Sequence, residues 1–240
     1  MKLRLVTWNV WFAPYEMSLR ASAMINILQK VNPDVICLQE VTCNFLEQIS
    51  RSQWITDKYF CSDPTYDGST IKKYGYGCAI LCKRHLSPSF SFVKFDNTEM
   101  GRHLITARCA IGDENQFVTF GNVHLESLDN AKTREAQLDV SNSLLPTGES
   151  ILVGDFNFCS ERNYDASLPL ENDCLSRTIP SYEDLWQKLK PEQHGFTFDS
   201  MVNKMIHSYE QARLGSTSTY KSFYILIHNK YSDMYWYFIH

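Results

Sequence analysis

Ile151-Leu152-Val153-Gly154-Asp155-Phe156-Asn157 is the stretch that decides the fold of this 240-residue chain. Three consecutive aliphatic residues predict a strand that is buried on both faces. The strand ends in Gly-Asp-x-Asn, where Gly154 permits a turn or a close backbone approach to a ligand. Asp155 and Asn157 are two residues apart, so on an extended backbone they would point the same way. A carboxylate beside an amide suits water activation and oxyanion binding, although the same residues are also good turn chemistry.

Apolar and polar runs divide the rest of the chain into short elements. They predict strands at 3–7, 35–38, 76–82, 90–95, 104–110 and 116–123, and helices at 18–31, near 45–49, at 131–145 and after the N-cap Ser181. The helix at 18–31 is amphipathic, with an apolar stripe spaced by four: Leu19, Ala23, Ile27 and Val31. Loops are predicted at 61–75 and 159–180, a hairpin turn at 112–115 and a short β-like segment at 196–199.

Length and composition fit one large α/β domain, because 44% of the residues are hydrophobic and 13% are aromatic. The order of elements predicts two β-sheets with helices on the outside. Net charge is −4 and no basic run is present, so any nucleic-acid contact must be local to a site. The eight cysteines lack zinc-ligand spacing and indicate buried, reduced thiols. The N-terminal residues lack the apolar core of a signal peptide and no apolar run approaches membrane-spanning length. We therefore expect a soluble protein of the cytoplasm or nucleus.

Polar side chains with complementary chemistry follow several of the predicted strands. They are Asn9, Glu40, His124, Asp155 and Asn157. Each one alone is typical of a turn or a solvated strand end, but together they suggest a site. Glu40 offers the hard oxygen ligand that suits Mg²⁺, and Asp155 could orient and deprotonate a water. The two amides, His124 and the Ser127 hydroxyl could hold phosphate oxygens, which indicates metal-assisted phosphoester hydrolysis.

Four motifs, in this order and spacing, resemble those of the endonuclease/exonuclease/phosphatase superfamily. They are Thr7-Trp8-Asn9, Leu38-Gln39-Glu40-Val41, His124-Leu125-Glu126-Ser127 and Gly154-Asp155-Phe156-Asn157. The third motif, followed by Arg134 and Gln137, most resembles the 5′-tyrosyl-DNA phosphodiesterase branch. Asp184-Leu185-Trp186 and Phe196-Thr197-Phe198-Asp199 resemble that branch too. The resemblance covers about residues 1–213, and its specificity lies in the ordered set rather than in any single motif.

The resemblance implies a four-layer α/β/β/α sandwich that depends on Mg²⁺ or Mn²⁺ and cleaves 5′-phosphotyrosyl-DNA bonds in DNA repair. The implied substrate is a DNA 5′ end that carries a tyrosyl adduct left by a trapped topoisomerase. By position, Glu40 binds the metal, Asp155 acts as the base, and Asn9, Asn157 and His124 complete the catalytic set. The implied substrate contacts are Ser127, Glu126, Arg134 and Phe198, the last beside the DNA end. Tyrosine is a fair leaving group, because the phenol pKa is about 10.

The chain also departs from the family pattern. Trp11 stands where the branch often carries an acidic residue, and Cys159 stands where it carries a basic one. The family continues with Arg-Leu-Asp and ends in Ser-Asp-His, whereas this chain reads Arg213-Leu214-Gly215 and later Ser232-Asp233-Met234. The implied aspartate–histidine pair is missing, so we expect impaired activity. Three late histidines are candidate substitutes, none in a family register: His207, His228 and His240.

These departures divide the chain into an endonuclease/exonuclease/phosphatase domain at 1–213 and an atypical tail at 214–240, with the last strands missing or diverged. The tail is crowded with Tyr, Ile, Phe, Lys, Asn and His, which favours translated intron or frameshifted sequence. The alternative is a diverged last strand. With that strand lost, apolar surface of one sheet would be left uncovered or covered badly. Two alternative functions follow: an inactive relative that binds metal or DNA ends, or another nuclease, deadenylase or lipid phosphatase of the superfamily.

Overall fold

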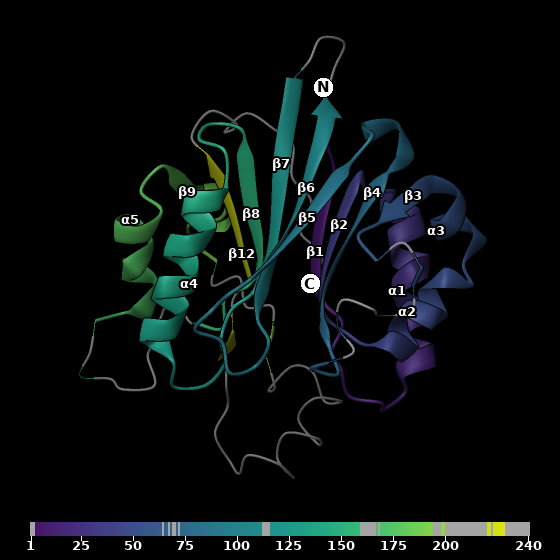
Figure 1. Ribbon diagram of the computed structural model, residues 1–240, viewed down its shortest axis with the longest axis horizontal. Helices are drawn as coiled ribbons and strands as arrows, with labels where there is room; N and C mark the ends of the chain where they lie inside the picture. Colours follow the sequence, from purple (N-terminus) through teal and green to yellow (C-terminus); the bar gives the residue numbers. More distant parts are fainter. Residues whose placement is uncertain are drawn as a thin grey trace.

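The chain folds into two face-to-face β-sheets with helices on both outer sides, as Figure 1 shows for this computed structural model. The structure describes residues 3–63, 65–66, 68, 71, 73–111, 116–158, 167, 169–193, 198–199, 220–221 and 223–228. Helices α1 (Met17–Val31), α2 (Cys43–Ser50) and α3 (Gln53–Lys58) cover the first sheet, while α4 (Ala131–Leu144) and α5 (Leu175–Thr178) cover the second. The four-layer α/β/β/α sandwich is therefore confirmed.

The first sheet has the strand order β1 (Leu5–Asn9), β2 (Val35–Val41), β4 (Gly77–Lys83) and β3 (Tyr59–Cys61). β1 and β2 are parallel and connected through α1, whereas β4 is antiparallel to both of its neighbours. Helix α3 and strand β3 were not predicted. They form because Tyr59 is buried, with its hydroxyl donating to the Pro33 carbonyl at 2.7 Å. The predicted loop at 61–75 therefore starts one residue too early, since Cys61 belongs to β3.

The second sheet has the strand order β5 (Ser89–Lys94), β6 (His103–Ile111), β7 (Gln116–His124), β8 (Ser150–Asp155), β12 (Phe223–His228) and β9 (Tyr182–Asp184). β5, β6 and β7 are successive antiparallel strands. The three strands were predicted, and so was the antiparallel pairing of β6 with β7. The hairpin turn predicted at 112–115 lies outside the described residues. β7 and β8 are parallel, and α4 makes the crossover between them.

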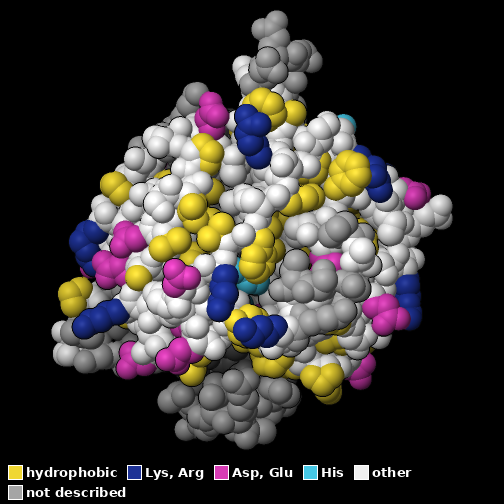
Figure 2. Space-filling model, in the orientation of Figure 1, with side chains coloured by type: hydrophobic (Ala, Val, Ile, Leu, Met, Phe, Trp, Pro, Cys, Tyr) yellow, Lys and Arg dark blue, Asp and Glu magenta, His cyan; other side chains and the backbone are white. Residues whose placement is uncertain are grey.

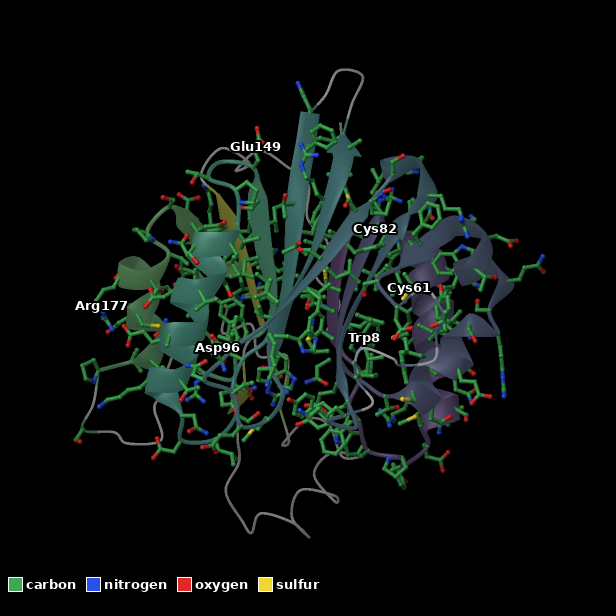
Figure 3. The ribbon with its side chains drawn as sticks, in the orientation of Figure 1. Trp8, Cys61, Cys82, Asp96, Glu149 and Arg177 are labelled. Atoms are coloured by element: carbon green, nitrogen blue, oxygen red, sulfur yellow. The ribbon has the colours of Figure 1, made fainter. Side chains whose placement is uncertain are left out.

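Three apolar layers hold these elements together. One fills the space between the sheets, and the others lie between each sheet and its helices. Figure 3 labels Cys82, which belongs to the middle layer, and Cys61, which belongs to the helix side of the first sheet. The cysteines that the structure describes are free thiols, mostly buried, as predicted. Among the described residues, no helix is long and apolar enough to cross a membrane.

A buried polar link also joins the two sheets. The Gln39 side-chain amide on β2 donates to Asn122 Oδ1 on β7 at 2.7 Å. Asn122 Nδ2 donates in turn to the carbonyls of Leu38 and Ala79, both at 3.0 Å. Both side chains are fully buried. Because buried amides are costly to leave unpaired, this link fixes how β7 sits against β2 and β4.

Helix α1 turns a different stripe to the core from the one predicted. Its buried residues are Met17, Ala21, Met24 and Leu28. Leu19 is 64% exposed and Ile27 is 36% exposed. The helix carries two apolar stripes, and hydrophobic spacing alone cannot choose between them. Arg20 decides the rotation, because its guanidinium reaches back to the carbonyls of Val10, Trp11 and Ala13.

The segment predicted as a loop at 159–180 is partly helical, with a 3₁₀ turn at Glu171–Cys174 that leads into α5. The predicted N-cap Ser181 is wrong. Residues 182–184 form β9, and helix α6 (Leu185–Leu189) starts after Asp184, whose carboxylate accepts from the Trp186 amide at 2.9 Å. Burial raises the pKa of Asp184 to about 6. Pairing with β12 extends residues 182–184 and moves the helix start three residues along.

The tail contributes a strand to the second sheet. Within 214–240, β12 pairs antiparallel with β8 from Phe223 opposite Asp155 to Ile227 opposite Ile151, and its other edge pairs with β9. Ile225 and Leu226 are buried. The expectation was that residues 216–240 would leave apolar surface of one sheet uncovered or cover it badly. β12 covers the surface beside β8, so the first alternative is wrong there. The short strands β10 (Phe198–Asp199) and β11 (Tyr220–Lys221) pair with each other, which confirms part of the β-like segment at 196–199.

Candidate active site

The ends of four strands, two from each sheet, bring the predicted polar residues together. Asn9 ends β1, Glu40 lies near the end of β2, His124 ends β7 and Asp155 ends β8. Each sheet contributes a parallel pair, so the carboxyl ends within a pair share one edge. Asn9 Nδ2 then crosses between the sheets, donating to Glu40 Oε1 and to Asp155 Oδ2, each at 3.0 Å. The prediction that these side chains lie together is confirmed.

Glu40 is aimed at the site by an irregular backbone. Its φ is 59°, and it lies where the pairing of β2 with β4 shifts register. A bulge of this kind re-aims a side chain and is common next to active sites. Its second carboxylate oxygen, Oε2, accepts from the Phe12 amide at 3.0 Å. A carboxylate has about four acceptor positions, so Glu40 keeps capacity for a metal ion.

The loop after β1 supplies that Phe12 amide, and Arg20 holds the loop in place. Arg20 Nη1 donates to the carbonyls of Val10 at 2.6 Å and Trp11 at 3.0 Å. Its guanidinium lies 4.7 Å from the Trp11 ring centroid. Burial lowers the pKa of Arg20, and the charge of Glu40 opposes that shift. Trp11, which stands where the tyrosyl-DNA phosphodiesterase branch often carries an acidic residue, thus packs on the Arg20 guanidinium.

Asp155 is 3% exposed and its carboxylate is fixed from two directions. Asn9 Nδ2 reaches Oδ2, and the backbone N–H of Asn157 donates to Oδ1 at 2.9 Å. Asn157 has φ 58°, and its side-chain amide donates to the Leu125 carbonyl at 2.9 Å. The expectation that Asp155 and Asn157 point the same way along an extended strand is wrong. Residues 154–157 therefore form a turn that is also part of the site. The turn places the backbone N–H of Asn157 within hydrogen-bond distance of the Asp155 carboxylate.

Gly154 permits a close approach between strands rather than an approach to a ligand. Its φ is 141°, and a Cβ added there would lie 1.9 Å from the Val123 carbonyl oxygen. The tight contact of β7 with β8 sets His124 directly opposite Asp155. His124 Nε2 lies 3.7 Å from Asp155 Oδ2.

Arg102, which no motif marks, completes this site. It is 4% exposed, and its guanidinium donates from Nη1 to His124 Nδ1 at 2.9 Å and from Nη2 to Ser127 Oγ at 2.7 Å. A guanidinium can only donate, so His124 Nδ1 accepts and the neutral ring carries its proton on Nε2, toward Asp155. Ser127 lies beside the site as predicted. The one signal for Arg102 in the sequence is a lone charge between Gly101 and the apolar strand at 104–110.

Two aromatic rings line the same end of the sandwich. The Arg102 guanidinium lies 5.4 Å from the Tyr76 ring centroid, a cation–π distance. Phe12 stacks on Tyr76 at 4.7 Å with an interplanar angle of 10°. The Tyr76 and His124 rings lie 6.4 Å apart. Neither ring was predicted, because aromatic residues outside the motifs are more often core residues.

Glu126 and Arg134, whose implied roles are substrate contacts, both bond within the fold. Both are 1% exposed. The Glu126 carboxylate accepts hydrogen bonds from the segment at 98–100 and from Gln137. Arg134 pairs with Glu171 and donates to the carbonyls of Glu126 and Leu128. These internal contacts occupy both side chains, and their implied role as substrate contacts stays a prediction.

Glu40, His124 and Asp155 are of the residue types that can bind a metal ion, and one ligand atom from each lies within 4.8 Å of the others. Two carboxylates from opposite sheets are the hard oxygen donors that suit Mg²⁺ or Mn²⁺. The donor set therefore fits a divalent ion. The proton on Nε2 suits His124 to donate a hydrogen bond rather than to bind the ion.

Several residues named from the sequence lie outside this description. Phe198 belongs to β10, but its side chain is not among the described residues. His228 is likewise placed only by its backbone in β12. Neither backbone nor side chain is among the described residues for Cys159, 213–215, 232–234, His207 and His240.

Known proteins resemble this chain in sequence. The sequence profile of the Endonuclease/Exonuclease/phosphatase family matches residues 6–206. The chain is 32% identical over 139 residues to a 5′-tyrosyl-DNA phosphodiesterase of Caenorhabditis briggsae, which covers 57% of this chain and 37% of that protein. It is 26% identical over 218 residues to tyrosyl-DNA phosphodiesterase 2 of Xenopus tropicalis, which covers 87% and 53%. The chain thus spans about half or less of the length of these relatives.

Solved structures share the fold. A D. rerio TDP2 complex with single-strand DNA product matches with a TM-score of 0.69 at 21% identity, over 93% of this chain and 82% of that one. TDP2 from C. elegans matches with a TM-score of 0.70 at 24% identity, over 92% and 63%. A sphingomyelinase C from Streptomyces griseocarneus matches with a TM-score of 0.68 at 16% identity, over 96% and 85%. The same sandwich therefore occurs in relatives with different names.

Proposed function

Because the chain belongs to the Endonuclease/Exonuclease/phosphatase family, we propose that it is a metal-dependent phosphodiesterase that cleaves 5′-phosphotyrosyl bonds at DNA ends. One observation carries this proposal. Asn9 joins Glu40 and Asp155 across the two sheets, with His124 and Arg102 directly beside them. A metal-binding carboxylate, a fixed base and a buried cation are together the equipment for phosphoester hydrolysis.

Asp155 is the proposed base. Asn9 and the Asn157 amide hold its two oxygens, so the remaining lone pairs can accept a proton from an attacking water. The water oxygen bonds to phosphorus, its proton passes to Asp155, and the tyrosyl oxygen leaves. Phenol has a pKa of about 10, so the phenolate is a better leaving group than an alkoxide.

Arg102 and His124 are the proposed donors to the phosphate oxygens. A fixed guanidinium and an imidazole N–H in a site with little water stabilise charge that develops as the phosphorus is attacked. Mg²⁺ or Mn²⁺, held by Glu40 with Asp155 beside it, would supply Lewis-acid stabilisation of the same charge. Asn9 holds the Glu40 and Asp155 carboxylates side by side through its two hydrogen bonds.

A DNA end that carries a tyrosyl adduct, as a trapped topoisomerase would leave, is the proposed substrate. The names of the relatives from Caenorhabditis and Xenopus support this choice. On the face in Figure 2, basic and acidic side chains of the described residues are dispersed rather than gathered into one basic surface. DNA binding is therefore proposed to be local to the site end. Repair in the nucleus, with a cytoplasmic pool, is the setting we propose.

The deciding assay compares three substrates with the same 240-residue chain in Mg²⁺. We expect hydrolysis of a 5′-phosphotyrosyl oligonucleotide, and much slower cleavage of the same oligonucleotide with a plain 5′ phosphate and of a sphingomyelin. EDTA and Asp155→Asn should each abolish turnover. Faster cleavage of the plain oligonucleotide or the lipid would instead favour a nuclease or lipid phosphatase. Mg²⁺ titration by calorimetry checks the metal, since Glu40→Gln should weaken binding at least tenfold without unfolding the chain.

A weakened enzyme is the second candidate, and the C-terminal residues favour it. Arg213-Leu214-Gly215 and Ser232-Asp233-Met234 replace the implied Arg-Leu-Asp and Ser-Asp-His. Losing one preorganised group that stabilises developing charge costs about 10²–10³ in rate. Grafting a family-like C-terminus onto residues 1–213 should raise turnover by a similar factor. A native chain that already matches the graft would contradict this proposal, while metal and DNA binding without turnover would favour an inactive relative.

A further inference from the structure

Glu126 lies two residues after His124 but turns its side chain away from the candidate site. Its carboxylate accepts from Thr98 Oγ1 at 2.8 Å, from the Glu99 amide at 3.1 Å and from the Met100 amide at 2.9 Å. These three donors belong to the turn between β5 and β6. All three contacts are donors, and the Glu126 carboxylate is the acceptor that they share. Glu126 therefore clamps that turn.

The turn held by Glu126 is the one that delivers Arg102. The Arg102 amide donates to Thr98 Oγ1 at 2.8 Å, and the Arg102 carbonyl accepts from the Phe95 amide at 3.1 Å. Gly101, just before it, has φ 74°, and a Cβ there would lie 2.2 Å from the Tyr74 ring. Two hydrogen bonds through Thr98 Oγ1 thus connect the Glu126 carboxylate to the Arg102 backbone.

Gln137 and Arg134 on α4 fix Glu126 itself. The Gln137 side chain donates to Glu126 Oε2 and accepts from the Glu126 amide, both at 2.9 Å. Arg134 Nη1 donates to the Glu126 carbonyl at 2.8 Å. All three side chains are almost fully buried. Such a satisfied network is rigid, because any movement would leave a buried polar group unpaired.

We infer that Glu126 is a positioning residue that sets Arg102 against His124 and Ser127. This inference rests on the proposed function, in which Arg102 faces the phosphate. The Arg102 guanidinium is buried and makes one hydrogen bond to each of these two side chains. The position of the guanidinium therefore depends on the position of the Arg102 backbone. The hydrogen bonds from Glu126 to residues 98–100 fix that backbone position. Misplacement of a catalytic group by about 1 Å costs on the order of 10²-fold in rate.

A double-mutant cycle between Glu126 and Arg102 tests the inference. Glu126→Gln keeps the shape but sets amide hydrogens against the donors of the turn. We expect kcat/KM for the phosphotyrosyl oligonucleotide to fall about 10–100-fold with Arg102 present, and by less than about threefold in Arg102→Ala. Equal losses in both backgrounds, or no loss with Arg102 present, would overturn the inference. Met24→Ala, in the α1 layer, is the matched control that lowers stability and leaves kcat/KM unchanged at 25 °C.

A second measurement does not need turnover. Histidine ¹⁵N NMR reports which ring nitrogen of His124 is protonated, and Arg102 holds the proton on Nε2. Glu126→Gln should move the His124 signals toward those of Arg102→Ala. Thr98→Val, which removes both Thr98 links and leaves the carboxylate in place, should do so as well. Unmoved signals in both variants would overturn the inference even in an inactive chain, whereas a failed hydrolysis assay with moved signals would count only against the proposed function.

Discussion

Asn9→Ala tests the feature on which the site depends, the amide that joins two carboxylates across the sandwich. Asn9 Nδ2 donates to Glu40 Oε1 and to Asp155 Oδ2, each at 3.0 Å. A hydrogen bond to a charged group contributes about 1.5–3 kcal/mol. Asn9 is half-buried, so solvent screening places each bond at the low end. Together they contribute about 3 kcal/mol.

The charges give a similar figure. Carboxylate oxygens of Glu40 and Asp155 lie within 4.8 Å of each other. At an effective dielectric constant of about 20, two unit charges at that distance repel by roughly 3 kcal/mol. The Asn9 amide hydrogens offset this repulsion, and a divalent ion would do the same. The variant should therefore lose about 3 kcal/mol of unfolding free energy in EDTA, and clearly less in saturating Mg²⁺.

Urea unfolding of the wild type and Asn9→Ala, in EDTA and in Mg²⁺, measures both quantities. The matched control is Asn26→Ala on the exposed face of α1, which should change stability by less than about 0.5 kcal/mol in either condition. A loss below about 0.5 kcal/mol for Asn9→Ala would refute the bridging role. A loss of the same size with and without Mg²⁺ would refute the link between the bridge and the metal.

Three further predictions concern stability and can be checked by urea unfolding. Gly154→Ala should cost at least about 3 kcal/mol, because its Cβ meets a carbonyl at 1.9 Å, whereas Gly75→Ala, at φ 81° in open space, should cost only about 1 kcal/mol. Asn122→Ala should cost about 3–5 kcal/mol by breaking the buried link, and an exposed Asn97→Ala should not. Because the pKa of Asp184 is raised in the folded chain, its protonated carboxyl group contributes fully to the free energy of unfolding below about pH 4. This contribution is lost as pH rises through about 6. Asp184→Asn, which can still cap α6, should therefore be more stable than wild type at pH 7 by about 3 kcal/mol and equal to it at pH 3.5.

The sequence alone determined the order of the main elements and the residues where the strands end. The apolar run at 151–153 predicts a buried strand, and the β-branched and aromatic residues at 116–123 predict another. The same local patterns predicted that Asn9, Glu40, His124 and Asp155 lie at the ends of strands. The resemblance to a family then supplied the four layers and the expected chemistry. These features depend on neighbours in sequence, which is why a sequence can carry them.

Only the tertiary structure decided how those residues are held. The bridge from Asn9 to Asp155 spans 146 residues, and the Arg102–His124 contact spans 22, so neither has a local signature. The sequence cannot show whether the Glu126 carboxylate contacts a substrate or accepts hydrogen bonds from the turn at 98–100. Its hydrogen-bond partners in the fold carry that information. Tertiary contacts also decided which stripe of α1 is exposed and how the strand β12 pairs. A helix rotation and a strand pairing are set by surfaces that other elements present, and those surfaces exist only after the chain has folded.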